Sequence, residues 1–448
     1  MERCDTLVIA HWCLPVEPDD RVLEDHAVVI QEGRITDLLP AAEARAKYSA
    51  GAVVERPHHV LLPGLVNAHT HAAMTLFRGY GDDLPLAQWL KTSIWPAEQR
   101  WVSAELVRDG TRHAIAEMLL SGTTCFSDQY YFPEIVAECA QEAQMRAVVG
   151  TPVIEFPTPW SDNAAHCLSK GTELVHDRYA DDPLISSCFA PHSTATVSDR
   201  TFDALRIQSD QLDKRVQIHL HESAQEVADE IESSGKRPFE RLWQLGLVNA
   251  SLMIVHGVHL TDDEIARCAS RNVAITHCPR SNLKLASGIA RVADMLEAGV
   301  AVALGTDGAA SNNELDLLGE LRTAALLAKA VADNAAALPA SAALRMATID
   351  GARALGLADT TGSIETGKWA DLACIDLRRI NSQPVYNPAS QVVYTAQASQ
   401  VSDTWVAGRH LVDGGQLTRI DIDEILARSS EWQQRITGQT SPGSKTQS

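Results

Sequence analysis

The chain has 448 residues, 45% of them hydrophobic, so it is long enough for one large barrel with its own core and a smaller unit beside it. It carries 58 acidic and 38 basic residues, a net charge of −20, which argues against a nucleic-acid partner and against an anionic membrane surface. Nine cysteines without a CxxC pair indicate buried thiols of a reduced compartment rather than a disulfide framework. The sequence has no signal-peptide pattern and no apolar stretch long enough to span a bilayer, so we expect a cytoplasmic protein.

Residues 1–62 have the pattern of short strands separated by turns. Leu7–Ala10 and His26–Ile30 are β-type runs, and Gln31–Ile35 has the pattern of a hairpin turn. This segment is therefore expected to form part of a small β domain.

Between residues 63 and 360, short apolar strands alternate with longer helical patterns. This alternation is typical of repeated βα units around a parallel sheet. Eight such units predict an α/β fold with a closed (β/α)8 TIM barrel, in which the chemistry sits at the carboxyl ends of the strands. The predicted strands are Gly64–His71, Thr123–Asp128, Arg146–Glu155, Leu184–His192, Val216–Glu222, Leu252–His259, Val273–Cys278 and Val300–Asp307.

The last part of the chain returns to strands and turns. After the alanine-rich helical sequence Ser341–Leu355, the segment Gly362–Asp376 again has strand character. We expect residues 361–436 to join the N-terminal strands in one small β-sandwich domain. Residues 437–448 are polar and rich in Gly, Ser and Thr, which predicts a disordered tail.

The first predicted barrel strand carries two histidines near its carboxyl end. Alternate residues of a strand share a face, so Asn67, His69 and His71 are predicted to point the same way. Two imidazoles held close on one rigid face are the start of a transition-metal site. A His-x-His pair alone is equally typical of two structural histidines, and further ligands have to decide.

Further candidates fall at the ends of three other strands. His219 lies at the end of the fifth strand with Glu222 just beyond it, His256 ends the sixth, and Asp307 ends the eighth. A lone histidine at a strand end is usually structural. Four strands that bring histidines and an acid to one rim instead favour a metal-dependent catalytic centre.

The segments that carry these residues resemble the amidohydrolase superfamily over nearly the whole chain. The resemblance is strongest to the 5′-methylthioadenosine/S-adenosylhomocysteine deaminases, and it rests on PGLVNAHTHAAMTLFRG, LAQWL, APHS, IHLHES, HCPRSNLKLASGIA and LGTDGAASNN. It implies one zinc ion per subunit, because the fourth strand has no lysine that could be carboxylated to bridge two metals. The implied ligands are His69, His71, His219 and Asp307, with His221 placed beside the site rather than on the metal.

The same resemblance implies a hydrolytic deamination with three catalytic residues. Zinc would acidify a bound water, and Asp307 would take the proton of that water. Glu222 would protonate N1 of an adenine ring while the oxygen attacks C6. His256 would stabilise the oxygen of the intermediate, after which ammonia leaves and an inosine-type product remains.

Several positions match residues that line the substrate pocket in that branch. Glu98 would accept hydrogen bonds from both ribose hydroxyls, since a carboxylate can accept two. The full implied set is Trp89, Glu98, His192, Glu222, Asp307 and Ser311. Three of these residues also have a purely structural interpretation: Trp89 as a core residue, Glu98 as a solvated helix acid and Ser311 as a helix cap.

The loop after the third strand bears on which nucleoside is used. Some relatives that act on S-adenosylhomocysteine carry arginines there to hold its carboxylate, whereas residues 151–169 contain no Arg or Lys. An apolar, mildly acidic loop suits a small methylthio group. We therefore predict 5′-methylthioadenosine as substrate, with S-adenosylhomocysteine or adenosine used less well; Arg146, Lys170 or a neighbouring subunit is the alternative source of charge.

Two other functions remain open at this point. One is an aminohydrolase or chlorohydrolase of another ring, such as guanine, 8-oxoguanine or a triazine. The other is a barrel scaffold that has lost catalysis, which the presence of all four ligands and Glu222 disfavours. The expected partners are a small nucleoside and further copies of the chain, because relatives are commonly dimers or larger.

Overall fold

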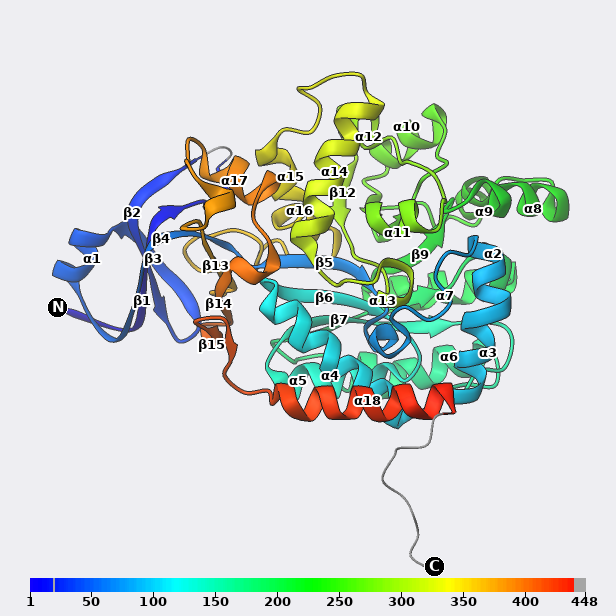
Figure 1. Cartoon of the computed structure of the whole chain (residues 1–448). Coiled ribbons are helices and arrows are strands. Elements are labelled where there is room, and N and C mark those ends of the chain that lie inside the picture. The colour runs from blue at the N-terminus through cyan, green and yellow to red at the C-terminus, as the bar shows by residue number, and fades with distance from the viewer. Residues whose placement is uncertain (19–20, 439–448) are drawn as a thin grey trace, which may run out of the picture.

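A computed structural model describes residues 1–18 and 21–438 of the chain. One of its two eight-stranded sheets consists of parallel strands in sequential order, which confirms the predicted barrel (Figure 1). The barrel strands are β5 (Leu65–Thr70), β6 (Thr123–Gln129), β7 (Arg146–Val153), β8 (Ile185–Pro191), β9 (Val216–Leu220), β10 (Leu252–His256), β11 (Ala274–His277) and β12 (Ala301–Leu304).

Several predicted strands end earlier in the structure than in the sequence pattern. His221, His256 and Asp307 have φ values of 55°, 72° and 60°, in the left-handed region that an extended strand does not use. These residues turn the chain at the barrel rim. The turns explain why β9 stops at Leu220 and leaves Glu222 in the loop that follows.

A side chain bridges the seam where the barrel nearly closes. No ladder pair joins β5 and β12 in the described part of the chain. Instead, the Asn67 side chain accepts a hydrogen bond from Thr306 N (3.0 Å) and donates one to Thr306 Oγ1 (2.8 Å), and Asp307 N donates to His69 O (3.1 Å). These bonds fix the first and last strands of the barrel against each other, beside the predicted metal ligands.

The two ends of the chain meet in a second, mixed sheet, as the sequence predicted. At the tip of the β2–β3 hairpin, Glu32 and Gly33 both have positive φ, the geometry of a tight two-residue turn. The sheet has the order β16-β15-β14-β13-β4-β1-β2-β3. Its strands are β1 (Glu2–Cys13), β2 (Leu23–Gln31), β3 (Arg34–Pro40), β4 (Tyr48–Pro63), β13 (Leu372–Asp376), β14 (Val401–Val406), β15 (Arg409–Asp413) and β16 (Gln416–Leu417).

The helices surround the barrel and cover parts of the mixed sheet (Figure 1). The α-helices are α1 (Ala41–Lys47), α2 (Leu86–Trp89), α3 (Trp95–Trp101), α4 (Ala104–Leu120), α5 (Pro133–Ala143), α6 (Ala164–Gly171), α7 (Asp199–Leu212), α8 (Ala224–Ser234), α9 (Pro238–Gln244), α10 (Asp262–Ser270), α11 (Pro279–Lys284), α12 (Val292–Glu297), α13 (Ala309–Asn312), α14 (Leu317–Val331), α15 (Ala340–Met346), α16 (Ile349–Ala354), α17 (Pro388–Tyr394) and α18 (Ile422–Thr437). Short 3₁₀ turns are η1 (Ala72–Phe77), η4 (Thr194–Thr196), η5 (Ile380–Ser382) and η6 (Ala398–Gln400), and η2 (Leu90–Ile94) and η3 (Thr172–Asp177) are π-helical.

The alanine-rich segment before the second part of the mixed sheet forms two helices, α15 and α16. The break has a local cause, because the carbonyl of Ala347 accepts a hydrogen bond from Val66 N of β5 (2.8 Å). Helix α18 lies along α4 at the outside of the barrel, where Arg428 and Trp432 both bond to Asp109 (Figure 1). The predicted tail begins at residue 437, but α18 extends to Thr437, and residues 439–448 lie outside the described part of the chain.

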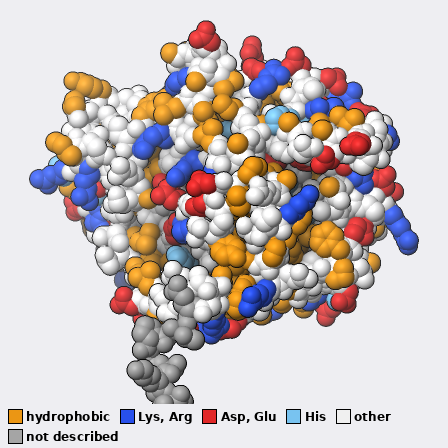
Figure 2. All heavy atoms as spheres, turned by 45° about the vertical axis from the view of Figure 1, so that its right-hand side comes forward, with side chains coloured by type: hydrophobic (Ala, Val, Ile, Leu, Met, Phe, Trp, Pro, Cys, Tyr) orange, Lys and Arg blue, Asp and Glu red, His pale blue; other side chains and the backbone are white. Residues whose placement is uncertain are grey.

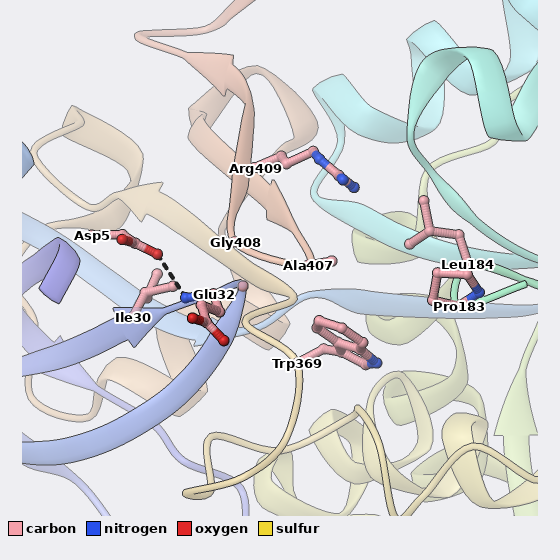
Figure 3. A pocket seen from close by; sticks show the side chains of 10 residues that line it. Asp5, Ile30, Glu32, Pro183, Leu184, Trp369, Ala407, Gly408 and Arg409 are labelled. Atoms are coloured by element: carbon pink, nitrogen blue, oxygen red, sulfur yellow. Dashed lines mark hydrogen bonds between the residues drawn. The ribbon is translucent and has the colours of Figure 1, made fainter.

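A buried ion pair joins the mixed sheet to the barrel. Arg146, at the start of β7, donates to Asp371 next to β13 at 2.7 Å, and both side chains are almost fully buried. Close by, Trp369 lines a pocket of about 360 Å³ between the sheet and the segment that precedes β8 (Figure 3). In this pocket Glu32 N donates to the carboxylate of Asp5, so the Asp5 side chain is used in closing the hairpin.

The surface is mixed in character. Figure 2 shows acidic, basic and hydrophobic side chains interspersed over one face, which agrees with acids spread along the sequence. Within residues 1–18 and 21–438, none of the helices combines the length and the hydropathy needed to cross a membrane.

Candidate metal centre

Four predicted ligands converge at the carboxyl ends of three barrel strands. One ligand atom from each of His69, His71, His219 and Asp307 lies within 4.8 Å of the other three. The carboxylate Oδ1 of Asp307 is 3.1 Å from His71 Nε2 and 3.5 Å from His69 Nε2. Three imidazoles and one carboxylate at this spacing are a donor set that suits zinc with an open coordination position.

Each of the three histidines is oriented by an oxygen at its other ring nitrogen. Nδ1 of His219 lies 2.9 Å from the carbonyl of His192, and Nδ1 of His71 contacts the carbonyl of Gln129. Nδ1 of His69 lies 3.4 Å from Gln217 Oε1. Since these oxygens only accept, they place the proton on Nδ1 and leave the Nε2 lone pairs free for a metal.

The charges of the site favour the same assignment. Burial lowers the pKa of His69 to about 4 and that of His219 well below its usual value, so both rings are neutral near pH 7. Burial also acts on His71 and Asp307, but their mutual attraction outweighs it: the pKa of His71 rises to about 9 and that of Asp307 falls well below its usual range. The carboxylate is therefore ionised. Without a metal, His71 holds a second proton beside Asp307, and a metal ion that binds Nε2 takes the place of that proton.

Asp307 is held by two serines as well as by its position on the rim. Ser281 Oγ donates to Asp307 Oδ2 at 2.6 Å, and Ser311 Oγ donates to the same oxygen at 2.5 Å. The other oxygen, Oδ1, is thus left to face the histidines. Ser311, predicted to line the substrate pocket, lines the cavity beside the cluster and also fixes this carboxylate.

The two remaining catalytic candidates lie next to this cluster. Glu222 follows β9, and its Oε2 is 3.8 Å from His256 Nε2 at the end of β10. Burial raises the pKa of Glu222, which favours the protonated carboxyl that a proton donor needs. The His256 ring is 1% exposed and is fixed by Asn282, whose Oδ1 lies 2.8 Å from Nδ1.

A pocket of about 960 Å³ opens over the cluster. Trp89, Glu98 and His192 all line it together with Glu222, so the structure brings these predicted residues to one cavity. Glu98 accepts a hydrogen bond from Tyr130 Oη at 2.7 Å, and burial raises its pKa to about 7. Trp89 Nε1 and His192 Nδ1 are buried and have no hydrogen-bond partner within the described part of the chain.

His221 does not join the metal cluster. Its ring contacts the carbonyl of His259 and Arg237 on one side, and it accepts a hydrogen bond from Phe239 N on the other. The left-handed turn at His221 rotates its side chain away from the face that His219 uses.

Four residues that support the site were missed by sequence reasoning. They are Gln129 and Gln217, which orient His71 and His69, and Ser281 and Asn282 on the short helix α11. Ser281 and Asn282 lie within the motif HCPRSNLKLASGIA directly after β11, so their place after a barrel strand was the available signal.

A second group of possible ligands lies in the mixed sheet. Asp403, His410 and Asp413 are close enough to share an ion. Arg56 already occupies the space between the carboxylates, with contacts of 2.5 and 2.6 Å to Asp403 and 3.2 Å to Asp413. This group is therefore an ion-pair network that fixes β4 against β14 and β15.

Comparison with known proteins agrees with this geometry. The model of the amidohydrolase family matches residues 60–411. The chain belongs to the amidohydrolase family. The match begins at the end of β4 and includes all eight barrel strands and the four metal ligands.

Two full-length amidohydrolase relatives carry the same name, 5-methylthioadenosine/S-adenosylhomocysteine deaminase. The protein from Teredinibacter turnerae is 45% identical over 427 residues, 95% of this chain and 96% of the relative. The protein from Saccharophagus degradans is 43% identical over 439 residues, 98% of each chain. A crystal structure of an adenosine deaminase from Xanthomonas campestris with bound zinc is 48% identical, with a TM-score of 0.96 over 98% of this chain and 99% of that one.

Proposed function

We propose that this chain is a zinc-dependent deaminase that converts the adenine ring of 5′-methylthioadenosine to the inosine-type product and releases ammonia. The single observation that supports it best is the cluster of His69, His71, His219 and Asp307, of which the last three line a pocket of about 960 Å³ together with Glu222. The relatives from T. turnerae and S. degradans and the zinc-bound adenosine deaminase support the same reaction.

The residues present fit one zinc ion. Their Nε2 atoms and the Asp307 carboxylate are the N and O donors that zinc takes in catalytic sites, and the pocket leaves one side of the cluster open. A zinc ion bound here would lower the pKa of a coordinated water so that it becomes nucleophilic near neutral pH. Asp307 is ionised and thus able to accept a proton from that water.

Glu222 and His256 act on the ring side of the reaction. Glu222 lines the pocket, and burial raises its pKa, which favours the protonated carboxyl; we infer that this carboxyl donates its proton to N1 of the adenine ring. This transfer lets C6 accept an oxygen without full negative charge on the ring. His256, whose Nε2 is 3.8 Å from Glu222, stabilises the oxygen added at C6. The C6–N6 bond then breaks: the proton held by Asp307 passes to the departing amino group, which leaves as ammonia, and the proton of the C6 hydroxyl returns to Glu222, which leaves a carbonyl at C6.

Glu98 is suited to bind the ribose of a nucleoside. Tyr130 occupies one oxygen of Glu98, and no described residue bonds to the other. The Glu98 carboxyl is therefore available to a hydroxyl pair, as a nucleoside substrate requires. Trp89 and His192 add a buried N–H donor and a buried ring nitrogen, neither of them bonded to another described residue.

The pocket wall favours an uncharged 5′ substituent. Lys91 is the single Lys or Arg among the described residues that line it, against acids that include Glu226, Asp229 and Glu230. The loop after β7 contributes Phe156, half exposed, rather than a cation. A carboxylate tail is disfavoured in such a wall, so we propose 5′-methylthioadenosine ahead of S-adenosylhomocysteine and adenosine.

The test is a side-by-side measurement of kcat/KM for 5′-methylthioadenosine, S-adenosylhomocysteine, adenosine and free adenine on enzyme of known zinc content. A lead for 5′-methylthioadenosine with no turnover of adenine supports the proposal. Equal use of S-adenosylhomocysteine contradicts the specificity argument. Inertness toward every nucleoside in a zinc-loaded enzyme contradicts the function and favours guanine, 8-oxoguanine or a triazine as substrate.

We also propose that copies of the chain associate and that the enzyme is cytoplasmic. Ile380, in η5, and Tyr386 both lie between β13 and α17 and are 97% and 92% exposed, large apolar side chains that a second copy would cover. All nine cysteines are buried free thiols, as a reducing compartment requires. Sedimentation of wild type and of Ile380→Asp/Tyr386→Asp tests the association; an unchanged mass contradicts this interface.

A further inference from the structure

Asn282 is bonded to His256 in a fully buried position. Its Oδ1 lies 2.8 Å from His256 Nδ1, and both residues are 1% exposed. A carbonyl oxygen can only accept, so Nδ1 of His256 carries a proton. In a neutral ring with the proton on Nδ1, the lone pair is on Nε2, the atom that faces Glu222 and the pocket.

Asn282 is itself held rigidly by its backbone. Its N–H donates to the carbonyl of Cys278 (3.0 Å), and its carbonyl accepts from Ser287 N (2.8 Å). These two bonds fix the residue from both sides of helix α11. The acceptor is thus presented to His256 at a position set by β11 and the loop after α11, not by the strand that carries the histidine.

The same helix also fixes a metal ligand. Ser281, the preceding residue, donates to Asp307 Oδ2 at 2.6 Å. Adjacent residues of α11 therefore orient two groups of the centre that come from β10 and from the end of β12. Helix α11, which lies between β10 and β12 in the sequence, thus sets the positions of His256 and Asp307 relative to each other.

We propose that Asn282 is a positioning residue that selects the Nδ1–H form of His256 and directs its Nε2 lone pair at the oxygen added to the substrate. This inference rests on the proposed function, in which a hydroxyl forms at C6. That hydroxyl donates its hydrogen bond to Nε2. The opposite proton placement would turn an N–H of the ring toward the pocket and leave the hydroxyl without this acceptor.

Three substitutions separate this role from a structural one. Asn282→Asp keeps the acceptor, Asn282→Leu removes it at similar size, and Leu283→Ala is a control on the exposed side of the same helix. For Asn282→Leu we expect kcat to fall roughly 100-fold with KM changed less than about threefold. Asn282→Asp should stay within about tenfold of wild type, and Leu283→Ala should match it.

A double-mutant cycle with His256→Ala supplies the decisive comparison. If Asn282 acts through His256, adding Asn282→Leu to His256→Ala lowers kcat by less than about threefold. The same roughly 100-fold loss in both backgrounds would overturn the proposal, as would full activity of Asn282→Leu. An Asp variant as poor as the Leu variant would also overturn it, because the amide would then act as a donor. Asn282→Ala replaces the Leu variant if the latter does not fold.

A readout independent of turnover distinguishes this inference from the proposed function. NMR of ¹⁵N-labelled histidine in the zinc-loaded protein should show His256 Nδ1 as the protonated nitrogen in wild type, with the proton redistributed in Asn282→Leu. A protonated Nε2 in wild type would contradict the inference whether or not nucleosides are deaminated. Normal nitrogen signals in a protein inert to nucleosides would instead contradict the function alone.

Discussion

The Nε2 atoms of His69 and His219, which come from the first and fifth barrel strands, lie 3.2 Å apart. Both rings carry their proton on Nδ1, so two lone pairs face each other inside the protein. Lone pairs at this distance repel one another unless a cation lies between or beside them. The arrangement is therefore one that a metal ion stabilises.

Removing one of these two rings should weaken zinc binding. For His219→Ala we expect the zinc content of the purified protein to fall well below the value of about one per chain in wild type, because one of the four protein ligands is lost. His221→Gln, two residues along the chain, is the control, because its ring bonds to Phe239 and the His259 carbonyl and not to the cluster. Elemental analysis of both proteins decides, and zinc retained in His219→Ala would refute the assignment.

Glu222 should be essential for turnover and dispensable for metal. Glu222→Gln keeps the shape of the side chain but removes its acidic proton, so kcat should fall by roughly 10²- to 10⁴-fold. Zinc content and the affinity for the inosine-type product should stay near those of wild type. A variant that loses its zinc, or one that keeps a normal kcat, would show that Glu222 has another role.

The burial of Glu98 predicts a pH-dependent stability. Burial raises its pKa from 4.5 to about 7, so the carboxyl favours the folded state below about pH 4.5, and this contribution is lost as the pH rises through about 7. Glu98→Gln cannot ionise and still accepts from Tyr130. We expect this variant to have a higher Tm than wild type at pH 8, with a free energy of unfolding larger by at most roughly 3 kcal/mol. At pH 5 the Tm values of the two proteins should be nearly equal.

The matched control for this measurement is Glu173→Gln, an exposed acid at the start of η3. It should show the same small change at both pH values. A Glu98→Gln variant that is equally stable to wild type at pH 8 would mean that the buried carboxyl is relieved by a partner outside the described contacts.

A cation placed in the loop after β7 should change substrate preference. Phe156 lines the pocket and is half exposed, so Phe156→Arg puts a guanidinium near the 5′ substituent at little cost to packing. We expect the ratio of kcat/KM for S-adenosylhomocysteine to that for 5′-methylthioadenosine to rise about tenfold, the value of one charge-assisted contact. Phe156→Leu should leave the ratio unchanged, and a similar rise in Phe156→Leu would indicate a steric cause.

The ion pair between the sheet and the barrel should carry much of their attachment. Arg146 is 3% exposed, and Asp371 also accepts from Thr361 and from Ala407 N. Arg146→Met leaves this carboxylate buried without its charge partner, a loss of roughly 3–5 kcal/mol that should lower Tm. Arg178→Met, which removes a half-exposed partner of Glu138, should change Tm little; equal effects of the two would contradict the argument.

The barrel and its metal ligands could be predicted from the sequence because their signals are local. Each strand is a short apolar run, and His69, His71, His219 and Asp307 stand at or next to strand ends whose order around the barrel follows from chain order. The choice of His219 rather than His256 as a metal ligand, and the role of each residue, came from the resemblance to the amidohydrolase superfamily.

The supporting residues could not be predicted, because their roles arise from strands that meet only in the folded barrel. Gln217 bonds to His69 across the barrel, Tyr130 bonds to Glu98 from another element, and Asn282 bonds to His256 from the next unit. Gln217 lies in β9, Asn282 lies in α11 and Tyr130 follows β6, and none of these side chains carries a local signal of its partner. The strand ends were also misjudged: the left-handed turn at His221 has no glycine to mark it, and at His256 the non-glycine residue before Gly257 already has positive φ.

Strand β4 lies in the middle of the mixed sheet, with β1 on one side and β13 on the other, where Leu61 pairs with Cys374. While the chain is being synthesised, the barrel-proximal edge of β4 therefore stays open until β13 has left the ribosome. An open edge beside a buried strand is a template for aggregation, and pairing across so long a stretch of sequence is slow. A shortened protein that ends before β13, even with every metal ligand present, would expose this edge for its whole lifetime.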